Sequence, residues 1–337
     1  MFTFIIVTNV NRICAILLKR GVLLVIIDRT KKRSTREAFG RALADLGKVN
    51  KNIVALDADL SASTQTKLFA KEFPERFFDV GIAEQDLIDT AAGLAAVGKI
   101  PFAATFAVFA TGRTYDQVRN TVCYSNFNVK IVGTHGGVTV GEDGATHQAL
   151  EDVALMSNLP NMSVIVPADY AETYAAIKYA AEHDGPFYIR VARASLPDVF
   201  VDGMELSVNA KVIKEGKDLS IITNGETLQE CIEAVNILTD KGIDAELIHI
   251  PFVKPFDKEA VIKTAGKTGF VVTVENHSIK GGLGSAVCET LSENLPTKVL
   301  RMGVNDCFGQ SGTAPELMKH FGLDSESIAK RIVEIRK

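Results

Sequence analysis

Residues 129–148 read VKIVGTHGGVTVGEDGATHQ, an apolar run followed by a loop that is rich in polar side chains. A short apolar run bounded by turn residues is typical of a strand that is buried on both faces of a sheet. In open α/β sheets, ligands bind in the crevice beyond the carboxyl ends of the strands. A solvated turn is the other interpretation of one such loop, and the neighbouring segments distinguish the two.

The segments around this stretch alternate between strand and helix patterns. Residues 34–49 predict a helix with Ser34 or Thr35 as its N-cap. Continuous apolar strands that alternate with helices indicate a mainly parallel sheet covered on both faces. The other predicted elements of this half are strands over 52–60, 100–107, 163–169 and 186–192, and helices over 82–98, 115–127 and 171–185.

A second alternation of strands and helices occupies the C-terminal part of the chain. Between the two alternations, residues 199–216 are polar and rich in turn residues, which predicts a linker. The predicted fold class is therefore α/β, with two doubly wound, mainly parallel-sheet domains over 31–198 and 217–337. The elements predicted for the second domain are strands over 219–225, 244–251, 270–276 and 297–303, and helices over 227–242, 258–269 and 284–294.

The first 30 residues are apolar, but Arg12, Lys19 and Arg20 interrupt them. No uncharged run approaches the ~20 residues that a membrane-spanning helix needs. The segment also lacks the charge and cleavage pattern of a signal peptide. We expect residues 1–30 to be a poorly packed extension of unknown role; an amphipathic anchor at a membrane surface is the alternative interpretation.

The composition argues against several classes of partner and site. A net charge of −4 and an isoelectric point near 5.9 disfavour nucleic acid as a main partner. None of the five cysteines forms a C-x-x-C pair, so we expect neither a zinc site nor a disulfide framework. This cysteine pattern suits a reducing compartment, and we expect a cytoplasmic protein without a membrane partner.

Two further polar loops follow predicted strands, as the loop in 134–148 does. They are DADLSAS at 57–63 and DVGIAEQ at 79–85. Because the carboxyl ends of parallel strands meet at one edge of a sheet, we expect the three loops to form one shared site. Three solvated turns at the same edge are a much weaker explanation than one solvated turn.

The motifs in these loops resemble those of transketolases and occur in the same order along the chain. The resemblance spans residues 34–330 and covers the pyrimidine-binding and C-terminal domains of that family. The fold it implies agrees with the α/β fold predicted from the alternation. The motifs are STREAFGRAL at 34–43, DADLSAST at 57–64, DVGIAEQ at 79–85, ATFAVF at 104–109, THGGVTVGEDGATHQ at 134–148 and VARASL at 191–196.

The half of a transketolase that holds the cofactor's diphosphate has no counterpart in this sequence. In the family that half carries a G-D-G motif and a later asparagine, and neither is found here. The chain thus resembles the C-terminal (B) subunit of a split transketolase. The resemblance implies an N-terminal (A) partner subunit, activity only in its presence, and a homodimer of this chain within a 2+2 assembly. It also implies thiamine diphosphate as cofactor, with Mg²⁺ ligands on the partner and no metal ligand here.

The resemblance assigns the cofactor's pyrimidine ring to three side chains. Glu84 is the carboxyl group that bonds pyrimidine N1′ and promotes the imino tautomer, whose nitrogen takes the proton from thiazolium C2. Phe106 and Phe109 form the aromatic platform under the ring. The family often has a tyrosine where this chain has Gly112, which predicts a ring pocket that is either more open or filled by another side chain. From the residues alone, a carboxylate that stabilises a helix N-terminus is the other interpretation of Glu84.

The same resemblance assigns the sugar substrate to the remaining loop residues. His135, Asp143 and His147 would bond substrate hydroxyls or phosphate, and His147 would also assist proton transfer. Arg36, Arg193 and Ser63 match the family's phosphate-binding residues, and arginine suits phosphate because its planar fork donates two parallel hydrogen bonds. We expect Glu142 to have a structural role only. The implied activity is transfer of a two-carbon ketol unit between sugar phosphates, as in the pentose phosphate pathway.

Three alternatives share parts of this pattern. The β subunits of 2-oxo-acid dehydrogenases have the same length and domains but lack the GEDGATHQ segment. Deoxyxylulose-phosphate synthase has a similar segment and a stretch like TYDQV at 114–118, but it is normally one long chain. A non-catalytic relative would not need Glu84, the two phenylalanines and the two arginines.

One glycine-rich turn lies in the second domain, within VENHSIKGGLGSAV at 274–287. It could hold an anion at a helix N-terminus. It is not a full G-x-G-x-x-G motif, so we favour a tight turn without a ligand.

Overall fold

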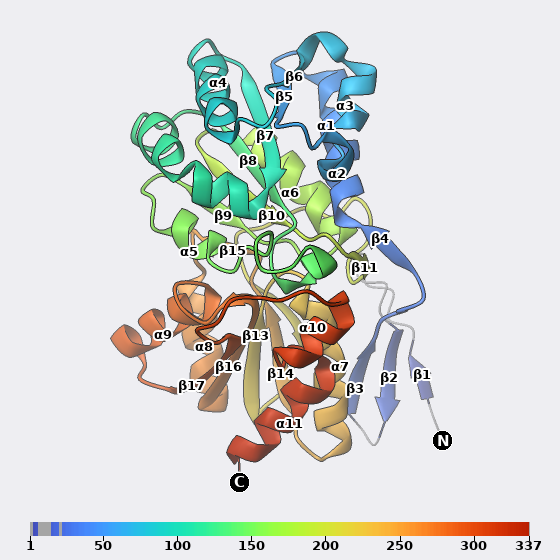
Figure 1. Ribbon diagram of the computed structural model, residues 1–337. Coiled ribbons are helices and arrows are strands. Elements are labelled where there is room, and N and C mark those ends of the chain that lie inside the picture. The colour runs from blue at the N-terminus through green and yellow to red at the C-terminus, as the bar shows by residue number, and fades with distance from the viewer. Residues whose placement is uncertain (1–2, 6–14, 20–21, 337) are drawn as a thin grey trace.

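The computed structural model describes residues 3–5, 15–19 and 22–336, and it contains two α/β units (Figure 1). The first unit lies above the second in this view, and each has helices on both faces of a central sheet. This arrangement confirms the predicted fold class of two doubly wound, mainly parallel domains.

The first sheet has seven strands in the order β15-β9-β10-β8-β7-β5-β6. All neighbours are parallel except β15, which runs antiparallel to β9. The chain order reverses between β5 and β7, so a crevice forms beyond the carboxyl ends of these two strands. The strands are β5 (Ile53–Asp57), β6 (Phe77–Asp79), β7 (Ile100–Phe106), β8 (Lys130–Thr134), β9 (Ser163–Ile165), β10 (Phe187–Val191) and β15 (Phe252–Lys254).

Helices cover both faces of this sheet because successive strand residues point to opposite sides. Ile53 packs into the core with α1 and α6, whereas Val54 packs into the core with α4 and α5. Ser34 is the N-cap of α1, and its side chain accepts a hydrogen bond from the Glu37 amide at 3.3 Å. The helices are α1 (Thr35–Val49), α2 (Ser61–Thr64), α3 (Lys67–Glu72), α4 (Glu84–Ala96), α5 (Asp152–Ser157) and α6 (Tyr170–Glu182), with π-helical segments at Phe109–Arg113 and Gln117–Tyr124.

The second sheet has five strands in the order β12-β14-β13-β16-β17, and only β12 is antiparallel to its neighbour. Helices α7 and α11 share one core with this sheet, and α8 and α9 share the other. The elements are β12 (Lys211–Lys214), β13 (Leu219–Thr223), β14 (Ala245–His249), β16 (Phe270–Ser278), β17 (Lys298–Val304), α7 (Thr227–Asp240), α8 (Lys258–Thr268), α9 (Leu283–Asn294), α10 (Ala314–His320) and α11 (Ser325–Arg336).

The boundary between the two units differs from the expected linker at 199–216. Strand β12 lies inside that range and pairs with β14, so the second sheet already begins at Lys211. In addition, β15 belongs to the C-terminal part of the chain but extends the first sheet. Two short strands pair with each other in an antiparallel manner: β4 (Lys32–Ser34), which precedes α1 in the chain, and β11 (Ser195–Pro197), which follows β10. The two units therefore share strands as well as a common core that includes Val138 and Leu150.

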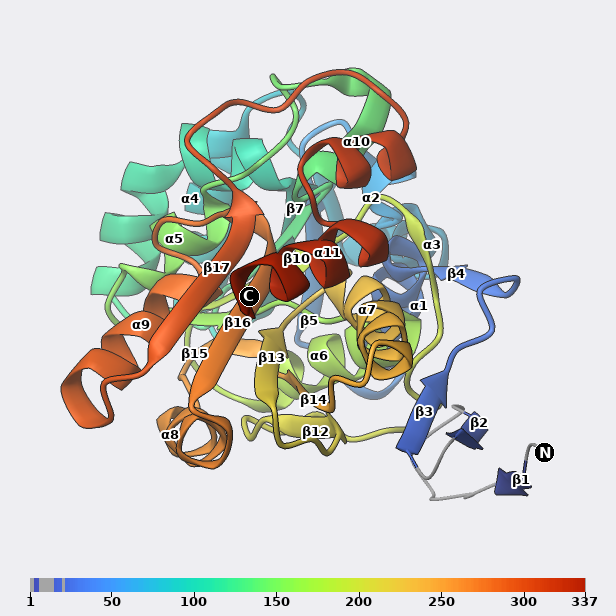
Figure 2. The ribbon, with the colours of Figure 1, turned by 90° about the horizontal axis from the view of Figure 1, so that it is seen from below.

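The described part of the first 30 residues contains a small antiparallel sheet in the order β1-β2-β3. Its strands are β1 (Thr3–Ile5), β2 (Ala15–Lys19) and β3 (Val22–Ile26), and β3 lies next to α7 and β12 (Figure 2). The expectation of an unpacked extension or a surface anchor falls partly on residues 6–14 and 20–21, which lie outside the described residues. Within the described residues, no helix is both long and apolar enough to cross a bilayer.

Candidate active site

The loops predicted to form one site do follow the carboxyl ends of strands in the first sheet. Phe106 is the last residue of β7, and His135 directly follows β8. Glu84 begins α4 a few residues after β6, and it is only 6% exposed. The parallel register of β7 and β8 pairs Phe106 with Thr134, which sets the phenyl ring beside the His135 imidazole.

Four rings form a continuous aromatic group at this edge. The Phe106 and Phe109 rings are nearly parallel, with centroids 5.8 Å apart and planes inclined by 13°. His135 stacks on Phe106 at 3.8 Å. His147 meets both phenyl rings edge-on, at 6.2 Å from Phe106 and 5.5 Å from Phe109. The two phenyl rings are thus an apolar group with one imidazole stacked on Phe106 and a second imidazole edge-on to both rings.

Glu84 has a partner that the sequence analysis did not identify. Arg113 Nη1 donates to Glu84 Oε1 at 2.8 Å, and Arg113 Cζ lies 3.9 Å from the Phe109 ring centroid. The Arg113 side chain is 51% exposed, in contrast to the buried glutamate. The only sequence signal is that Arg113 follows Phe109 by four residues, a spacing that puts two helical side chains on one face.

Gly112 leaves open space beside this group. A Cβ atom added to Gly112 would meet no other atom within 4 Å. The residue itself is exposed.

Arg36 and Arg193 bring positive charge to the same region. Arg36 Nη1 donates to the backbone carbonyl of Ser63 at 2.8 Å, and its Nε is buried without a hydrogen-bond partner among the described residues. Arg193 Nη1 donates to the Val140 carbonyl at 2.7 Å and to Glu142 at 2.9 Å. Burial and, next, the charge of Arg193 lower the pKa of Arg36. The structure thus holds two guanidinium groups close enough to repel each other.

His135 is buried and held in an unusual backbone conformation. Its φ is 60°, its side chain is 3% exposed, and Nδ1 shares a 2.9 Å hydrogen bond with the Thr134 hydroxyl. Burial and, next, the charge of Arg36 lower the pKa of His135 to about 3. The imidazole is therefore neutral near pH 7, and it can donate or accept a hydrogen bond without carrying charge.

The remaining predicted substrate residues differ in the contacts that they make. His147 Nδ1 shares a 2.9 Å hydrogen bond with the Thr146 hydroxyl, and its ring joins the aromatic group. Asp143 is exposed and makes no hydrogen bond or ion pair with another described residue. Ser63 faces Arg36 through its carbonyl rather than its hydroxyl.

The second unit holds the loop that carries these residues. The Val138 amide donates to Asn276 Oδ1 at 3.0 Å, and the Thr139 hydroxyl donates to Glu226 at 2.7 Å. Gln148 Nε2 donates to the Gln310 carbonyl at 3.0 Å, and α10 packs against the turns at Val138–Asp143. Sequence reasoning missed this role because the partners are distant along the chain.

Two glycines allow the loop to approach the second unit closely. Gly141 has φ +83° and Gly144 has φ +77°, a region that side chains disfavour. A Cβ at Gly144 would lie 2.6 Å from Ser311 Oγ, and a Cβ at Gly141 would lie 3.4 Å from the Gly312 carbonyl oxygen. The loop therefore has a steric reason for glycine at both positions.

In the glycine-rich turn of the second unit, a carboxylate side chain of the protein occupies the position where an anion could bind. Glu275 accepts hydrogen bonds from the Leu283 and Gly284 amides, both at 2.8 Å, at the start of α9. The two oxygens of this carboxylate therefore fill the helix N-terminus that could have held a ligand. This agrees with the prediction of a tight turn.

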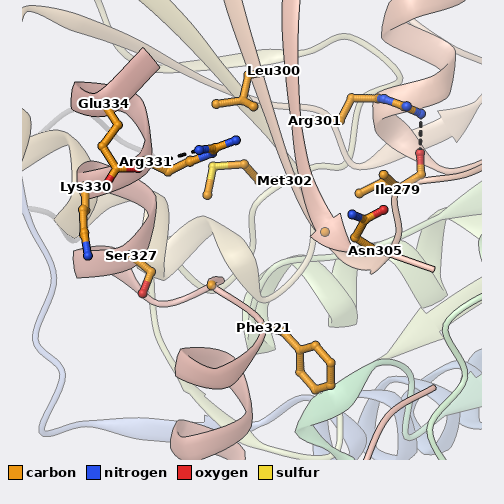
Figure 3. Close-up of a pocket in the computed structure, with 12 residues that line it drawn as sticks. Ile279, Leu300, Arg301, Met302, Asn305, Phe321, Ser327, Lys330, Arg331 and Glu334 are labelled. Carbon is orange, nitrogen blue, oxygen red and sulfur yellow. Dashed lines mark hydrogen bonds and ion pairs between the residues drawn. The ribbon is translucent and has the colours of Figure 1, made fainter. Parts of the chain in front are cut away.

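A cavity of about 440 Å³ lies elsewhere, between β17 and α11 (Figure 3). Arg301 and Arg331 line it, but Arg301 donates to the Ile279 carbonyl at 2.7 Å and Arg331 pairs with Glu334 at 3.7 Å. None of the predicted site residues lines this cavity. Within the described residues, no group of three or more His, Cys, Asp or Glu side chains could hold a metal ion.

Comparisons with known proteins match both units. The transketolase pyrimidine-binding domain matches residues 31–199, and the transketolase C-terminal domain matches residues 208–328. A protein of Methanocaldococcus jannaschii, provisionally named a transketolase C-terminal section, is 50% identical and covers 90% of this chain and 97% of its own length. A 6-deoxy-6-sulfo-D-fructose transketolase subunit of a Clostridium species is 43% identical, covering 89% of this chain and 94% of itself. A solved structure described as a split-gene transketolase in an inactive β4 tetramer is 50% identical, with a TM-score of 0.84 over 90% of this chain and 98% of that one.

Proposed function

Because the chain belongs to the transketolase family, we propose that it is the pyrimidine-binding subunit of a split ketol transferase that uses thiamine diphosphate. The observation that carries the proposal is a buried carboxylate beside two parallel phenyl rings at a sheet edge. Glu84 is 6% exposed, and it is linked through Arg113 to the Phe109 ring. A planar group with an N–H donor fits both the carboxylate and the ring face.

The residues present fit an aminopyrimidine. When bound, thiamine diphosphate supplies a carbon nucleophile that accepts the two-carbon unit from the donor sugar. Glu84 would share a hydrogen bond with pyrimidine N1′ and would exchange the proton at that atom. Phe106 and Phe109 orient the ring by stacking and exclude water from one of its faces.

The two arginines suit the anionic end of a sugar substrate. Arg36 has a buried Nε without a described partner, and Arg193 adds to the positive field around it. A phosphate between them would use the unpaired donor and offset the repulsion between the two guanidinium groups. The sulfonate of the sugar in the name of the Clostridium relative is also a tetrahedral anion. We propose sugar phosphates as substrates, as in the pentose phosphate pathway, with His135, His147 and Asp143 bonding the hydroxyl groups.

We also propose that activity requires an N-terminal partner subunit. The relatives that match nearly over their full length are a C-terminal section and a subunit of a transketolase. One related chain is described as inactive when it forms a β4 tetramer by itself. The partner would provide the diphosphate site and the Mg²⁺ ligands, with two copies of each subunit in the assembly. A C₂ dimer of this chain at its centre would follow the usual symmetry of such assemblies.

Reconstitution tests this proposal. The purified chain is assayed with thiamine diphosphate and Mg²⁺ for ketol transfer from xylulose 5-phosphate to ribose 5-phosphate, alone and with the partner subunit. We expect no turnover by the chain alone and turnover with the partner, abolished by Glu84→Gln. Full turnover by the isolated chain would contradict partner dependence, and no turnover with the partner on any sugar phosphate pair would contradict the proposed activity.

A further inference from the structure

Arg113 takes up both binding features that the pyrimidine ring would use. Its guanidinium donates to Glu84 Oε1 at 2.8 Å, and its Cζ lies over the Phe109 ring at 3.9 Å. We propose that Arg113 is a displaceable occupant of the pyrimidine site, which must leave Glu84 when thiamine diphosphate binds. This inference rests on the proposed function, since it concerns the same site.

The guanidinium and the aminopyrimidine are chemically similar in the relevant respects. Both are planar and delocalised, and both stack on an aromatic face. The guanidinium presents N–H donors to a carboxylate, and the pyrimidine presents one at N1′ in its imino or protonated form. Glu84 and Phe109 therefore recognise either group by the same contacts. Because the two groups compete for one carboxylate and one aromatic surface, cofactor binding must include the removal of Arg113.

The burial of the two partners explains why such an occupant is useful. The Glu84 carboxylate is buried, and a buried carboxylate without a hydrogen-bond donor is costly. Arg113 is 51% exposed, so water can hydrate its guanidinium when it leaves. Arg113 thus keeps the carboxylate paired until the pyrimidine binds, and displacing Arg113 costs little free energy because its ion pair is partly exposed.

The backbone around Arg113 allows the side chain to move without the segment. The Arg113 carbonyl accepts from Gln85 Nε2 at 3.2 Å, and the Thr114 hydroxyl donates to the Ala110 carbonyl at 2.6 Å. The neighbouring Gly112 is exposed and has open space where its side chain would be. A rotation of the Arg113 side chain into this space would uncover both Glu84 and Phe109.

A binding experiment tests the proposal without using turnover. Thiamine diphosphate with Mg²⁺ is titrated calorimetrically into the complex of this chain with its partner. Arg113→Ala and Arg113→Gln should bind the cofactor roughly three- to ten-fold more tightly, because the competing contacts are half-exposed and weak. Arg119→Ala is the matched control, since Arg119 is an exposed arginine of the next helical segment whose described partner is its neighbour Asn120.

The outcomes separate this inference from the proposed function. Equal or weaker cofactor binding by both Arg113 variants, with wild-type binding intact, would overturn the displaceable occupant alone. Absence of cofactor binding by wild type and variants alike would overturn the proposed function, and the inference with it.

Chemical modification gives an independent result. In the wild-type complex, the rate at which phenylglyoxal modifies Arg113 is followed by mass spectrometry of peptides, with Arg119 as internal reference. Cofactor binding should raise the relative rate at Arg113, because the guanidinium loses its carboxylate partner. A lower rate in the presence of cofactor would mean that Arg113 contacts the bound cofactor, and would overturn the proposal.

Discussion

Glu84 and Glu275 are buried glutamates at or beside helix N-termini, one in each unit, and they differ in which groups donate hydrogen bonds to them. Glu275 is 2% exposed, and both of its oxygens accept from backbone amides at the start of α9. Glu84 is 6% exposed, and its described partner is the half-exposed side chain of Arg113. The hydrogen-bond donors to Glu275 are backbone amides, which cannot move away, whereas the donor to Glu84 is a side chain, which can.

The difference explains how similar motifs acquire different roles. A carboxylate bonded to backbone amides fixes a turn, because both of its oxygens are held by groups that cannot move away. A carboxylate bonded to a mobile side chain can exchange that partner for a ligand group of the same chemistry. Burial and helix position are common to both glutamates, so only the identity of the partner distinguishes a structural carboxylate from an available one.

The largest effect is expected for Glu84→Gln, measured in the reconstituted complex. The amide cannot exchange a proton with N1′, and loss of such a group commonly lowers activity ~10²-fold or more. The free energy of unfolding should change little, because the amide oxygen of the substituted side chain can still accept a hydrogen bond from Arg113. The exposed part of the Arg113 guanidinium is also hydrated by water. Activity within a few-fold of wild type would remove Glu84 from the mechanism and with it the contrast to Glu275.

A second prediction concerns Arg36→Ala and Arg193→Ala. Each should raise the KM for phosphorylated sugars roughly 10- to 150-fold, as expected for a lost charge-assisted contact of ~1.5–3 kcal/mol. The KM for hydroxypyruvate, an unphosphorylated donor, should change much less. Glu142→Gln, which removes the described acidic partner of Arg193, is the control and should have a small effect. Equal changes for both donors would contradict a phosphate-binding role.

Much of this fold could be predicted because its signals are local. Alternating apolar strands and helices gave both sheets, and Ser34 was identified as one of two possible N-caps of α1. The short strands could not be found in this way. β15 has three residues and lies next to Pro251 and Pro255, and it is a strand only because β9 presents an open edge.

The site was predicted from motifs, so the contacts made by residues outside those motifs were missed. Asn276, Glu226 and Gln310 hold the loop of the first unit, but each lies far along the chain from the residue it contacts. No periodicity reports such a contact, because it depends on how two units pack. Arg113 was missed for a different reason: an exposed arginine on a helical segment is ordinarily a solvated side chain.

The third prediction concerns Glu275, the glutamate bonded to backbone amides. Glu275→Ala removes the acceptor of two buried amides, at a cost of about 1–3 kcal/mol for each orphaned donor. The free energy of unfolding, measured with urea, should fall by that order in the isolated chain. Activity per folded molecule in the complex should stay within a few-fold of wild type. Loss of activity with unchanged stability would reverse the roles assigned to the two glutamates.

The smallest effect is expected from the pH dependence of stability that His135 contributes. Its pKa is about 3 in the folded chain, against an ordinary value near 6.5. Between these values the unfolded chain binds a proton at this histidine and the folded chain does not. The free energy of unfolding therefore falls as the pH decreases from 6.5, with a slope of up to about 1.4 kcal/mol per pH unit from this group.

His135→Asn should remove that part of the slope, as measured by urea unfolding of both proteins between pH 4.5 and 6.5. Other titrating groups contribute equally to both proteins, so they cancel in the difference. Arg36→Ala should raise the folded-state pKa of His135, so that the slope is lost at a higher pH than in wild type, because the Arg36 charge is, after burial, the largest cause of the low pKa of His135. Parallel pH profiles for wild type and His135→Asn would mean that His135 has the same pKa in both states. The imidazole would then carry charge at the border of the site below pH 6.5, and it would repel the arginines instead of lying neutral beside them.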